Sequence, residues 1–328
     1  MNTDSAGDLR IGIIGLDTSH GVAFTRLLND PTEPANVPGG RVVAAVKTWS
    51  PDMPASVDRV EGFAATVEQD FGVKILPTIE ALGAEVDAVL ILSLDGRVHL
   101  EQARAVFATG KRVFIDKPLA ASLRDVCEIF RLANAVGVPV FSSSAYRFYE
   151  SLIDVKRADI GEVRSAISCG PAYLDPHHPD LFFYGIHPTE ALFAVLGCGC
   201  EVVLRAHTPD SDVVTGTWSD GRLGVLHGLR TSAIPHKVTV FGSVGFAEQQ
   251  LRDPGLNVFG EIRRSQMAGT DSYASLLREI IAFFRSGVPP VRAEETIEMF
   301  AFMEAADESK HRGGAPVKLS EVMAAARK

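Results

Sequence analysis

Two groups of residues in this chain have the types and spacing to stabilise a developing charge or to move a proton. Lys117 stands directly before Pro118, and a residue before proline is held in the extended region, which directs this lysine outward from a strand end. A cation at such a place stabilises negative charge that develops on an oxygen. His187 and Glu190 are three residues apart, so on a helix that begins near Ile186 they share a face, where the carboxylate orients the imidazole or binds a hydroxyl. The imidazole of His187 suits acid–base chemistry near neutral pH.

The N-terminal half predicts a framework that positions the lysine. The run from Leu9 to Gly15 is short, apolar and β-branched, which is typical of a strand buried on both faces of a parallel sheet. Thr18 and Ser19 are good N-cap residue types for the helix that follows. The alternation continues with strands at 41–46, 88–92, 112–115 and 138–141 and helices at 58–71, 98–109 and 123–135. This pattern predicts a doubly wound, Rossmann-type parallel sheet that binds ligands at the carboxyl ends of its strands.

The C-terminal half has longer strand patterns joined by turns such as Asp220-Gly221. Strands are expected at 163–168, 202–207, 213–218, 223–230 and 237–241, and helices at 186–196, 273–285 and 294–310. We therefore expect an α+β domain with a large, mainly antiparallel sheet whose uncovered face favours self-association. The predicted organisation is a flexible N-terminus over 1–8, a nucleotide-binding domain over 9–142, and an α+β substrate-binding and oligomerisation domain over 143–328.

Composition excludes several classes of protein. The chain has 328 residues, more than one hydrophobic core usually serves. Its 32 Lys and Arg against 41 Asp and Glu give a net charge of −9, and the basic residues are scattered, which argues against a nucleic-acid partner. The polar N-terminus and the lack of a long apolar run argue against secretion and a membrane span. Four cysteines without CxxC spacing fit reduced thiols, so we expect a cytoplasmic protein.

Three segments, in this order, resemble the glucose-fructose oxidoreductase, inositol dehydrogenase and MocA family. They are the opening strand-glycine-helix, the run VFIDKPLA at 113–120, and the run GIHPTE at 185–190. The resemblance covers nearly the whole chain. It implies a nicotinamide cofactor, a carbohydrate-like or polyol substrate, and a homo-oligomer, dimer or tetramer, formed through the C-terminal sheet.

The resemblance also implies residue roles in an NAD(P)-dependent dehydrogenase that acts on CH–OH groups. Lys117 polarises the reacting oxygen, His187 moves the proton, and Glu190 with Tyr184 positions the ring. Family dehydrogenases commonly carry an aspartate four residues before this histidine, whereas this chain has Phe183 there. Tyr184 is the nearest substitute, and Asp180 is another possible carboxylate. The neighbouring His177-His178 loop has no strong metal-binding spacing, so no metal site is expected.

The glycine loop after the first strand departs from the dinucleotide-binding pattern. Gly15 occupies the first glycine position, Asp17 replaces the second and His20 replaces the third. A carboxylate about 4 Å from a phosphate, at an effective dielectric constant of about 20, opposes binding by roughly 4 kcal/mol. Two interpretations remain: Asp17 caps the helix and satisfies the amides that a phosphate would use, or Thr18, Ser19 and a protonated His20 donate to a displaced phosphate.

Other residues at strand ends complete the predicted cofactor surface. Lys47 ends the second strand, where an NAD-preferring domain often has a carboxylate, so it either favours a 2′-phosphate, and hence NADP over NAD, or is a solvated lysine. His99 lines the cofactor cleft or only the start of its helix. The predicted cofactor-binding residues are Gly15, Asp17, Thr18, Ser19, His20, Lys47, Ser93, His99, Asp116 and Lys117.

Two alternative functions follow from these departures. The same fold can retain its cofactor and use transient oxidation in glycoside cleavage or elimination. Alternatively, the chain is a non-catalytic sensor or scaffold with a degenerate dehydrogenase site, an interpretation that depends on Asp17 and Phe183.

Overall fold

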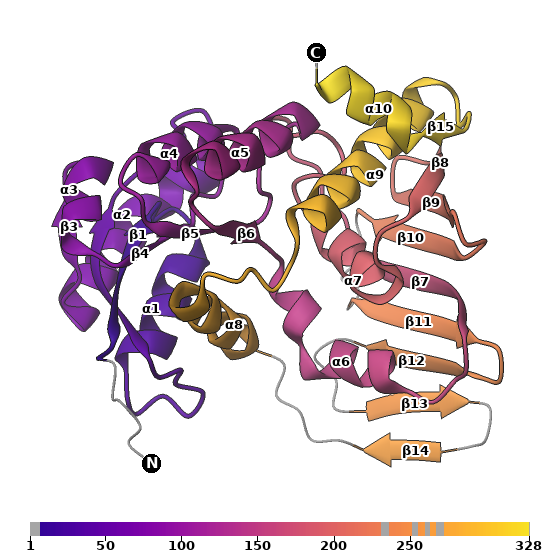
Figure 1. Cartoon of the computed structure of the whole chain (residues 1–328), viewed down its shortest axis with the longest axis horizontal. Coiled ribbons are helices and arrows are strands. Elements are labelled where there is room, and N and C mark those ends of the chain that lie inside the picture. Colours follow the sequence, from indigo (N-terminus) through magenta and orange to yellow (C-terminus); the bar gives the residue numbers. More distant parts are fainter. Residues whose placement is uncertain (1–6, 231–235, 251–254, 260–262, 267–271, 328) are drawn as a thin grey trace. The chain divides into compact units, whose positions relative to one another are not determined.

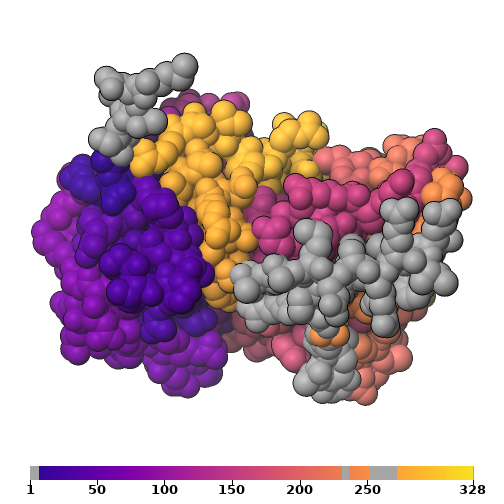
Figure 2. All heavy atoms as spheres, turned by 90° about the horizontal axis from the view of Figure 1, so that it is seen from below, coloured from indigo at the N-terminus to yellow at the C-terminus, as the bar shows by residue number. Residues whose placement is uncertain are grey.

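The chain is described from a computed structural model that covers residues 7–230, 236–250, 255–259, 263–266 and 272–327. Its internal contacts divide it into two compact units (Figures 1 and 2). The first unit comprises residues 1–120, 128–142 and 277–290, and the second comprises 121–127, 143–276 and 291–328. Each unit is described by itself.

The first unit contains the expected Rossmann-type sheet. Six parallel strands lie in the order β3-β2-β1-β4-β5-β6. The strands are β1 (Leu9–Ile14), β2 (Gly40–Val46), β3 (Lys74–Leu76), β4 (Ala88–Ile91), β5 (Arg112–Ile115) and β6 (Val140–Ser142). The helices are α1 (Ser19–Asn29), α2 (Pro54–Phe71), α3 (Ile79–Glu85) and α4 (His99–Phe107), with most of α5 (Leu123–Val136) and of α8 (Tyr273–Ser286). The predicted parallel sheet is confirmed, and α3 was not foreseen.

Helices cover both faces of this sheet. In Figure 1, α4 and α5 lie on one face, and α1 and α8 on the other. The helix expected at 273–285 was predicted to belong to the second domain, but the C-terminal part of α8 packs within the first unit. The ring of Phe283 meets that of Phe141 edge-on at 4.9 Å, and the Arg112 guanidinium donates to the Arg285 carbonyl at 2.9 Å. The apolar face of α8 thus completes the core of the first unit.

The second unit contains a nine-stranded sheet in the order β14-β13-β12-β11-β7-β10-β9-β8-β15. Its strands are β7 (Val163–Pro171), β8 (Cys200–His207), β9 (Ser211–Trp218), β10 (Leu223–Leu229), β11 (Lys237–Gly242), β12 (Phe246–Gln250), β13 (Gly255–Phe259), β14 (Arg263–Gln266) and β15 (Val317–Lys318). All neighbours are antiparallel except β7 and β10. The predicted α+β architecture with a mainly antiparallel sheet is confirmed.

Three helices pack on one face of this sheet, namely α6 (Glu150–Arg157), α7 (Ile186–Leu196) and α9 (Ala293–His311), while α10 (Leu319–Ala326) follows β15 (Figure 1). The core beneath them is aromatic: Trp218 lies 5.6 Å from Phe193 and 6.5 Å from Phe302 between ring centroids. A Cβ atom at Gly216 or Gly224 would approach the indole to 2.9 or 2.5 Å, so both glycines make room for it. Among the described helices, none is long and apolar enough to cross a membrane.

Candidate active site

The turn between β1 and α1 has the geometry of a phosphate-binding loop. Gly15 has φ +89°, and a Cβ atom there would lie 2.4 Å from the Ser93 backbone nitrogen, so the position requires glycine. Thr18 is the N-cap residue, as predicted, and its hydroxyl accepts from the His20 backbone N–H at 3.0 Å. Helix α1 therefore begins directly after the turn, with its N-terminus at the carboxyl edge of the sheet, where anions bind.

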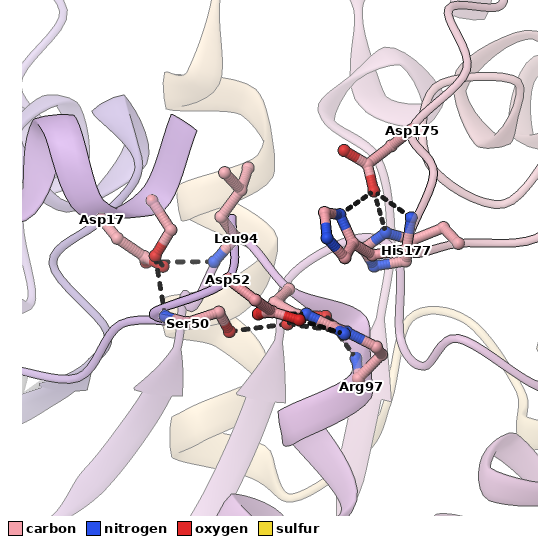
Figure 3. A network of polar contacts seen from close by, with 10 residues as sticks. Asp17, Ser50, Asp52, Leu94, Arg97, Asp175 and His177 are labelled. Carbon is pink, nitrogen blue, oxygen red and sulfur yellow. Dashed lines mark hydrogen bonds and ion pairs between the residues drawn. The ribbon is translucent and has the colours of Figure 1, made fainter. Parts of the chain in front are cut away.

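The structure does not support the interpretation that Asp17 caps helix α1. Its side chain is fully buried and accepts hydrogen bonds from the Ser56 hydroxyl at 2.7 Å and from the Leu94 backbone N–H at 3.0 Å (Figure 3). Burial raises the pKa of this carboxyl. The carboxylate therefore does not cap α1, and it is removed from the surface on which a cofactor phosphate would lie. The prediction that Asp17 contacts the cofactor is corrected for this reason.

A polar network that the sequence did not suggest extends from this carboxylate (Figure 3). The Ser56 hydroxyl also accepts from the Ser50 backbone N–H at 2.8 Å, and the Ser50 hydroxyl donates to Asp95 at 2.6 Å. Arg97 binds Asp95 and makes two 2.8 Å bonds to Asp52. These contacts raise the pKa of the Arg97 guanidinium. The loops that follow β1, β2 and β4 are thereby fixed to one another.

His20 and Asp116 were both predicted to contact the cofactor. In the structure their side chains contact each other. The Nδ1 atom of His20 lies 2.5 Å from the Asp116 carboxylate, and its ring stacks on Phe24 at 5.2 Å. Burial alone would raise the pKa of Asp116, but the neighbouring His20 and Lys117 outweigh it and hold that pKa below the ordinary value. Asp116 is only 2% exposed, so it pairs internally instead of offering a surface for cofactor contact.

His99 connects the segment that contains Lys117 to the backbone at Ser93. His99 is the first residue of α4 and is fully buried, with Nδ1 3.0 Å from the Pro118 carbonyl and Nε2 2.9 Å from the Ser93 carbonyl. Burial lowers the pKa of this imidazole. His99 was predicted either to line the cofactor cleft or to belong only to the start of its helix. Its full burial supports the second role. Lys117, which precedes Pro118 through a cis peptide bond, lies partly exposed just beyond the end of β5.

Lys47 is paired but still accessible. Its Nζ atom lies 2.9 Å from a Glu61 carboxylate oxygen and 5.8 Å from the Trp49 ring centre, and its side chain is 31% exposed. An exposed pair of this kind contributes little to stability. Lys47 therefore remains available to a ligand at the end of β2.

In the second unit, His187 lies in the first turn of α7 and is held on several sides. Its Nδ1 atom is 2.7 Å from the Ser144 hydroxyl, next to the 3-10 helix η2 (Ala145–Phe148). The rings of Tyr146 and Tyr184 meet the imidazole edge-on at 5.1 and 5.0 Å. The predicted neighbour Tyr184 is thus in contact with His187, whereas Ser144 and Tyr146 were not predicted as site residues.

Glu190 shares this region but binds different partners from those expected. Its carboxylate, 1% exposed, accepts from the Ser143 hydroxyl at 3.0 Å and forms an ion pair with Arg147, which also pairs with Glu295 at 2.6 Å. The expectation that Glu190 orients the imidazole directly is corrected, because a buried carboxylate is stabilised most by the buried guanidinium. Glu190 instead fixes residues 143–147, which hold Ser144 against His187.

Two other carboxylates of the second unit, those of Asp180 and Asp175, also bind partners other than His187. Asp180, proposed as a substitute for the absent aspartate, pairs with Arg205 at 2.9 Å and with Lys310. Asp175 contacts the Nδ1 atoms of His177 and His178 at 3.1 and 3.0 Å (Figure 3). Over the part of the chain that the structure describes, His, Cys, Asp and Glu form no group of three or more that could hold a metal ion.

The residues of the first unit fit a dinucleotide. The turn at Gly15 leaves no space for a side chain, Thr18 caps a helix N-terminus at the sheet edge, and the charges of Asp17 and Asp116 are directed to internal partners. A Rossmann-type sheet with such a turn is suited to binding a nicotinamide dinucleotide such as NAD or NADP.

Comparison with known proteins identifies a family match in the N-terminal part of the chain. Residues 9–144 match the model of the GFO_IDH_MocA oxidoreductase family with an NAD-binding Rossmann fold. This is the family that the motifs of the sequence resemble.

Similarity extends beyond the matched domain. The chain is 27% identical over 313 residues to D-xylose 1-dehydrogenase (NADP(+)) 2 of Haloferax volcanii, covering 84% of this chain and 94% of the relative. It is 26% identical over 278 residues to a myo-inositol 2-dehydrogenase of Thermotoga maritima, covering 73% and 81%. An oxidoreductase from Agrobacterium radiobacter, solved in complex with NAD+, L-tartaric acid and magnesium, has the same fold, with a TM-score of 0.79, 17% identity and coverage of 96% and 99%.

Proposed function

We propose that the protein oxidises or reduces a secondary alcohol carbon of a carbohydrate or polyol with NAD or NADP. The observation that carries the proposal is Lys117, a cation at the carboxyl end of β5 on a segment that His99 fixes, in a chain that also holds His187 in the first turn of α7. The names of the relatives, a xylose and an inositol dehydrogenase, support the substrate class.

Each residue has a role that follows from its charge and surroundings. Lys117 donates to the substrate oxygen and stabilises the alkoxide charge that develops on it. His187 exchanges the proton of that oxygen, and Tyr184 packs against its ring. Glu190 is a positioning residue that acts through Arg147 and Ser143. The bound nicotinamide supplies the hydride acceptor or donor.

We propose a preference for NADP, based on Lys47. A partly exposed ammonium at the end of β2 suits a 2′-phosphate, and its present partner Glu61 is itself exposed. Lys47→Ala should weaken NADPH binding by about fivefold and leave NADH binding within about twofold, since one partly exposed charge contact contributes about 1 kcal/mol. Equal effects on both cofactors would exclude this role.

A substrate screen tests the proposed reaction. The purified protein is incubated with NADP or NAD and a panel of pentoses, hexoses and inositols, and reduced nicotinamide is followed by absorbance. Turnover of at least one member that is lost in both Lys117→Met and His187→Gln, with cofactor binding retained, supports the proposal. Turnover that survives both substitutions would reject these roles.

The structure weakens one alternative function. The sensor or scaffold interpretation depended on Asp17 and Phe183, and the burial of Asp17 removes the first of these reasons. A cofactor-retaining lyase or glycosidase would release no net reduced nicotinamide in the same screen.

We also propose that the protein is a cytoplasmic homo-oligomer. Ile167, Val225, Thr215 and Leu204 lie in register across β7, β10, β9 and β8, and Ile167 and Leu204 are 36% and 37% exposed. Exposed apolar rows of this kind favour burial in an interface. Light scattering should give a dimer or larger assembly that dissociates in an Ile167→Glu, Leu204→Glu variant; a monomeric wild type would refute the proposal.

A further inference from the structure

A second imidazole, His236, lies beside His187 in the second unit. His236 directly precedes β11, is 6% exposed, and its ring centre lies 5.7 Å from that of His187. Tyr146 contacts both rings, at 4.2 Å from His236 and 5.1 Å from His187. His236 was not among the predicted site residues, because no motif around it indicates that it lies close to His187 in the folded chain.

The sheet has a specific place for this ring. A Cβ atom at Gly170, in β7, would lie 2.2 Å from Nδ1 and 2.7 Å from Cε1 of His236. Any larger residue at position 170 would therefore displace the imidazole. The close approach is possible only because β7 has a glycine at the point where the His236 ring crosses it.

The protonation of His187 depends on the charged and titratable groups around it, and His236 is one of them. Beneath α7, β7 and β10 present buried uncharged residues such as Ser168, Gly170 and Leu226. The buried Asp212 of β9, in register with Gly228 of β10, is paired with Arg205 and Arg230. The titratable rings that contact His187 include Tyr146, Tyr184 and His236. Nearby charges on η2, α7 and α9 belong to the Arg147, Glu190 and Glu295 ion pairs. Where relatives commonly have an aspartate, this chain has Phe183, whose ring lies 5.2 Å from His178.

We propose that His236 is a positioning residue for His187, and that the two imidazoles form a coupled pair that carries at most one positive charge near neutral pH. An aspartate would favour a protonated imidazole, whereas a second imidazole opposes it. A positive charge on His236 therefore keeps His187 in its neutral form, which accepts a proton from an alcohol. This inference rests on the proposed function and extends it: at neutral pH the site favours alcohol oxidation over carbonyl reduction.

Protonation of the histidines measured by NMR tests the coupling without relying on catalysis. The protein is labelled with 15N-histidine, the His187 and His236 signals are assigned from the His187→Gln and His236→Gln variants, and the pH is varied. Two unit charges about 5.7 Å apart at an effective dielectric constant of about 20 separate the two protonation steps by about 2 pH units. The His187 step should move to higher pH by about one unit or more in His236→Gln.

A second variant and a control make the test specific. Gly170→Ala should reproduce the shift, because it displaces the His236 ring without removing it. His227→Gln, which removes an imidazole bonded to Ser211 on the opposite face of the same sheet, should leave the His187 step unchanged.

The outcomes separate this inference from the proposed function. If turnover is found, the acidic limb of the kcat/KM profile should follow the NMR shift in both variants. An unchanged His187 step in both His236→Gln and Gly170→Ala overturns the coupling, whatever the enzyme's substrate. A shifted step in a protein that binds no NAD(P) leaves the coupling intact and rejects only the proposed function.

Discussion

Substitutions of Asp17 test whether its carboxylate is buried and directed away from the cofactor. Asp17→Ala removes the acceptor of two buried donors, the Ser56 hydroxyl and the Leu94 N–H. Each buried donor left without a partner costs about 1–3 kcal/mol. A free-energy loss of about 2–4 kcal/mol is expected, since removal of a buried carboxylate offsets part of the cost.

Asp17→Asn separates the hydrogen bonds from the charge. Its amide oxygen can accept from Leu94 and its amino group can donate to the Ser56 oxygen, so the expected loss is below about 1 kcal/mol. The two proteins should also differ with pH. Because burial raises the pKa of Asp17 in the folded protein above its unfolded value, its stabilisation is present at low pH and is lost as the pH rises through the folded-state pKa. The asparagine variant lacks this slope.

Cofactor affinity distinguishes this account from one in which Asp17 faces a phosphate. Removing a charge about 4 Å from a phosphate would relieve roughly 4 kcal/mol and tighten NADPH binding by about a thousandfold. With the carboxylate buried and directed inward, Asp17→Asn should change the NADPH Kd by less than about threefold.

Urea unfolding and a fluorescence titration with NADPH provide both measurements, and Asp58→Asn, an exposed carboxylate on α2, serves as the control. If Asp17→Asn or Asp17→Ala tightened NADPH binding tenfold or more while leaving stability unchanged, the inward orientation of Asp17 would be refuted.

Three further predictions concern other charged groups. Lys117→Met should lower kcat/KM by about 10²–10³ with the NADPH Kd within about threefold, as judged by steady-state kinetics and titration; loss of binding instead would assign Lys117 to the cofactor alone. Glu190→Gln should cost about 2–3 kcal/mol in urea unfolding, below the ~3–5 typical of a broken buried pair, because Arg147 keeps Glu295; unchanged stability would contradict the buried pairing. Burial raises the pKa of Asp307 to about 7, so its stabilisation is lost as the pH rises from about 4 to about 7. Asp307→Asn should therefore raise the thermal midpoint relative to wild type at about pH 8 but not at about pH 5, and equal effects at both would contradict this shift.

Much of the framework follows from hydrophobic periodicity. The runs around Leu9–Ile14 and Arg112–Ile115 are apolar on both sides because both faces of a parallel sheet are covered, and the helix at 186–196 was predicted with its observed ends. Helices α3 and α6 were not assigned, since seven or eight residues make only about two helical turns and carry little periodicity. The assignment of α8 depended on a long-range contact between Phe283 and Phe141 that local sequence does not reveal.

The candidate site was predictable where a residue type and its flanking residues restrict the backbone, as at Gly15, Thr18 and Lys117. The residues that contact the site side chains were not predictable from the sequence. Asp17 meets Ser56 from 39 positions away, and His187 meets Ser144 from 43 positions away, so only the folded chain pairs them. Such contacts depend on topology and register rather than on spacing within one helix or strand.

Cofactor-dependent turnover is the most direct test of the central claim. Trp49, 46% exposed at the end of β2, reports binding through energy transfer to reduced nicotinamide, and Trp49→Phe identifies its contribution. We expect NADPH or NADH to bind with a submillimolar Kd and the oxidised cofactor to be reduced by a sugar or polyol. Failure of both cofactors to bind at millimolar concentration would contradict the assignment as an NAD(P)-dependent oxidoreductase.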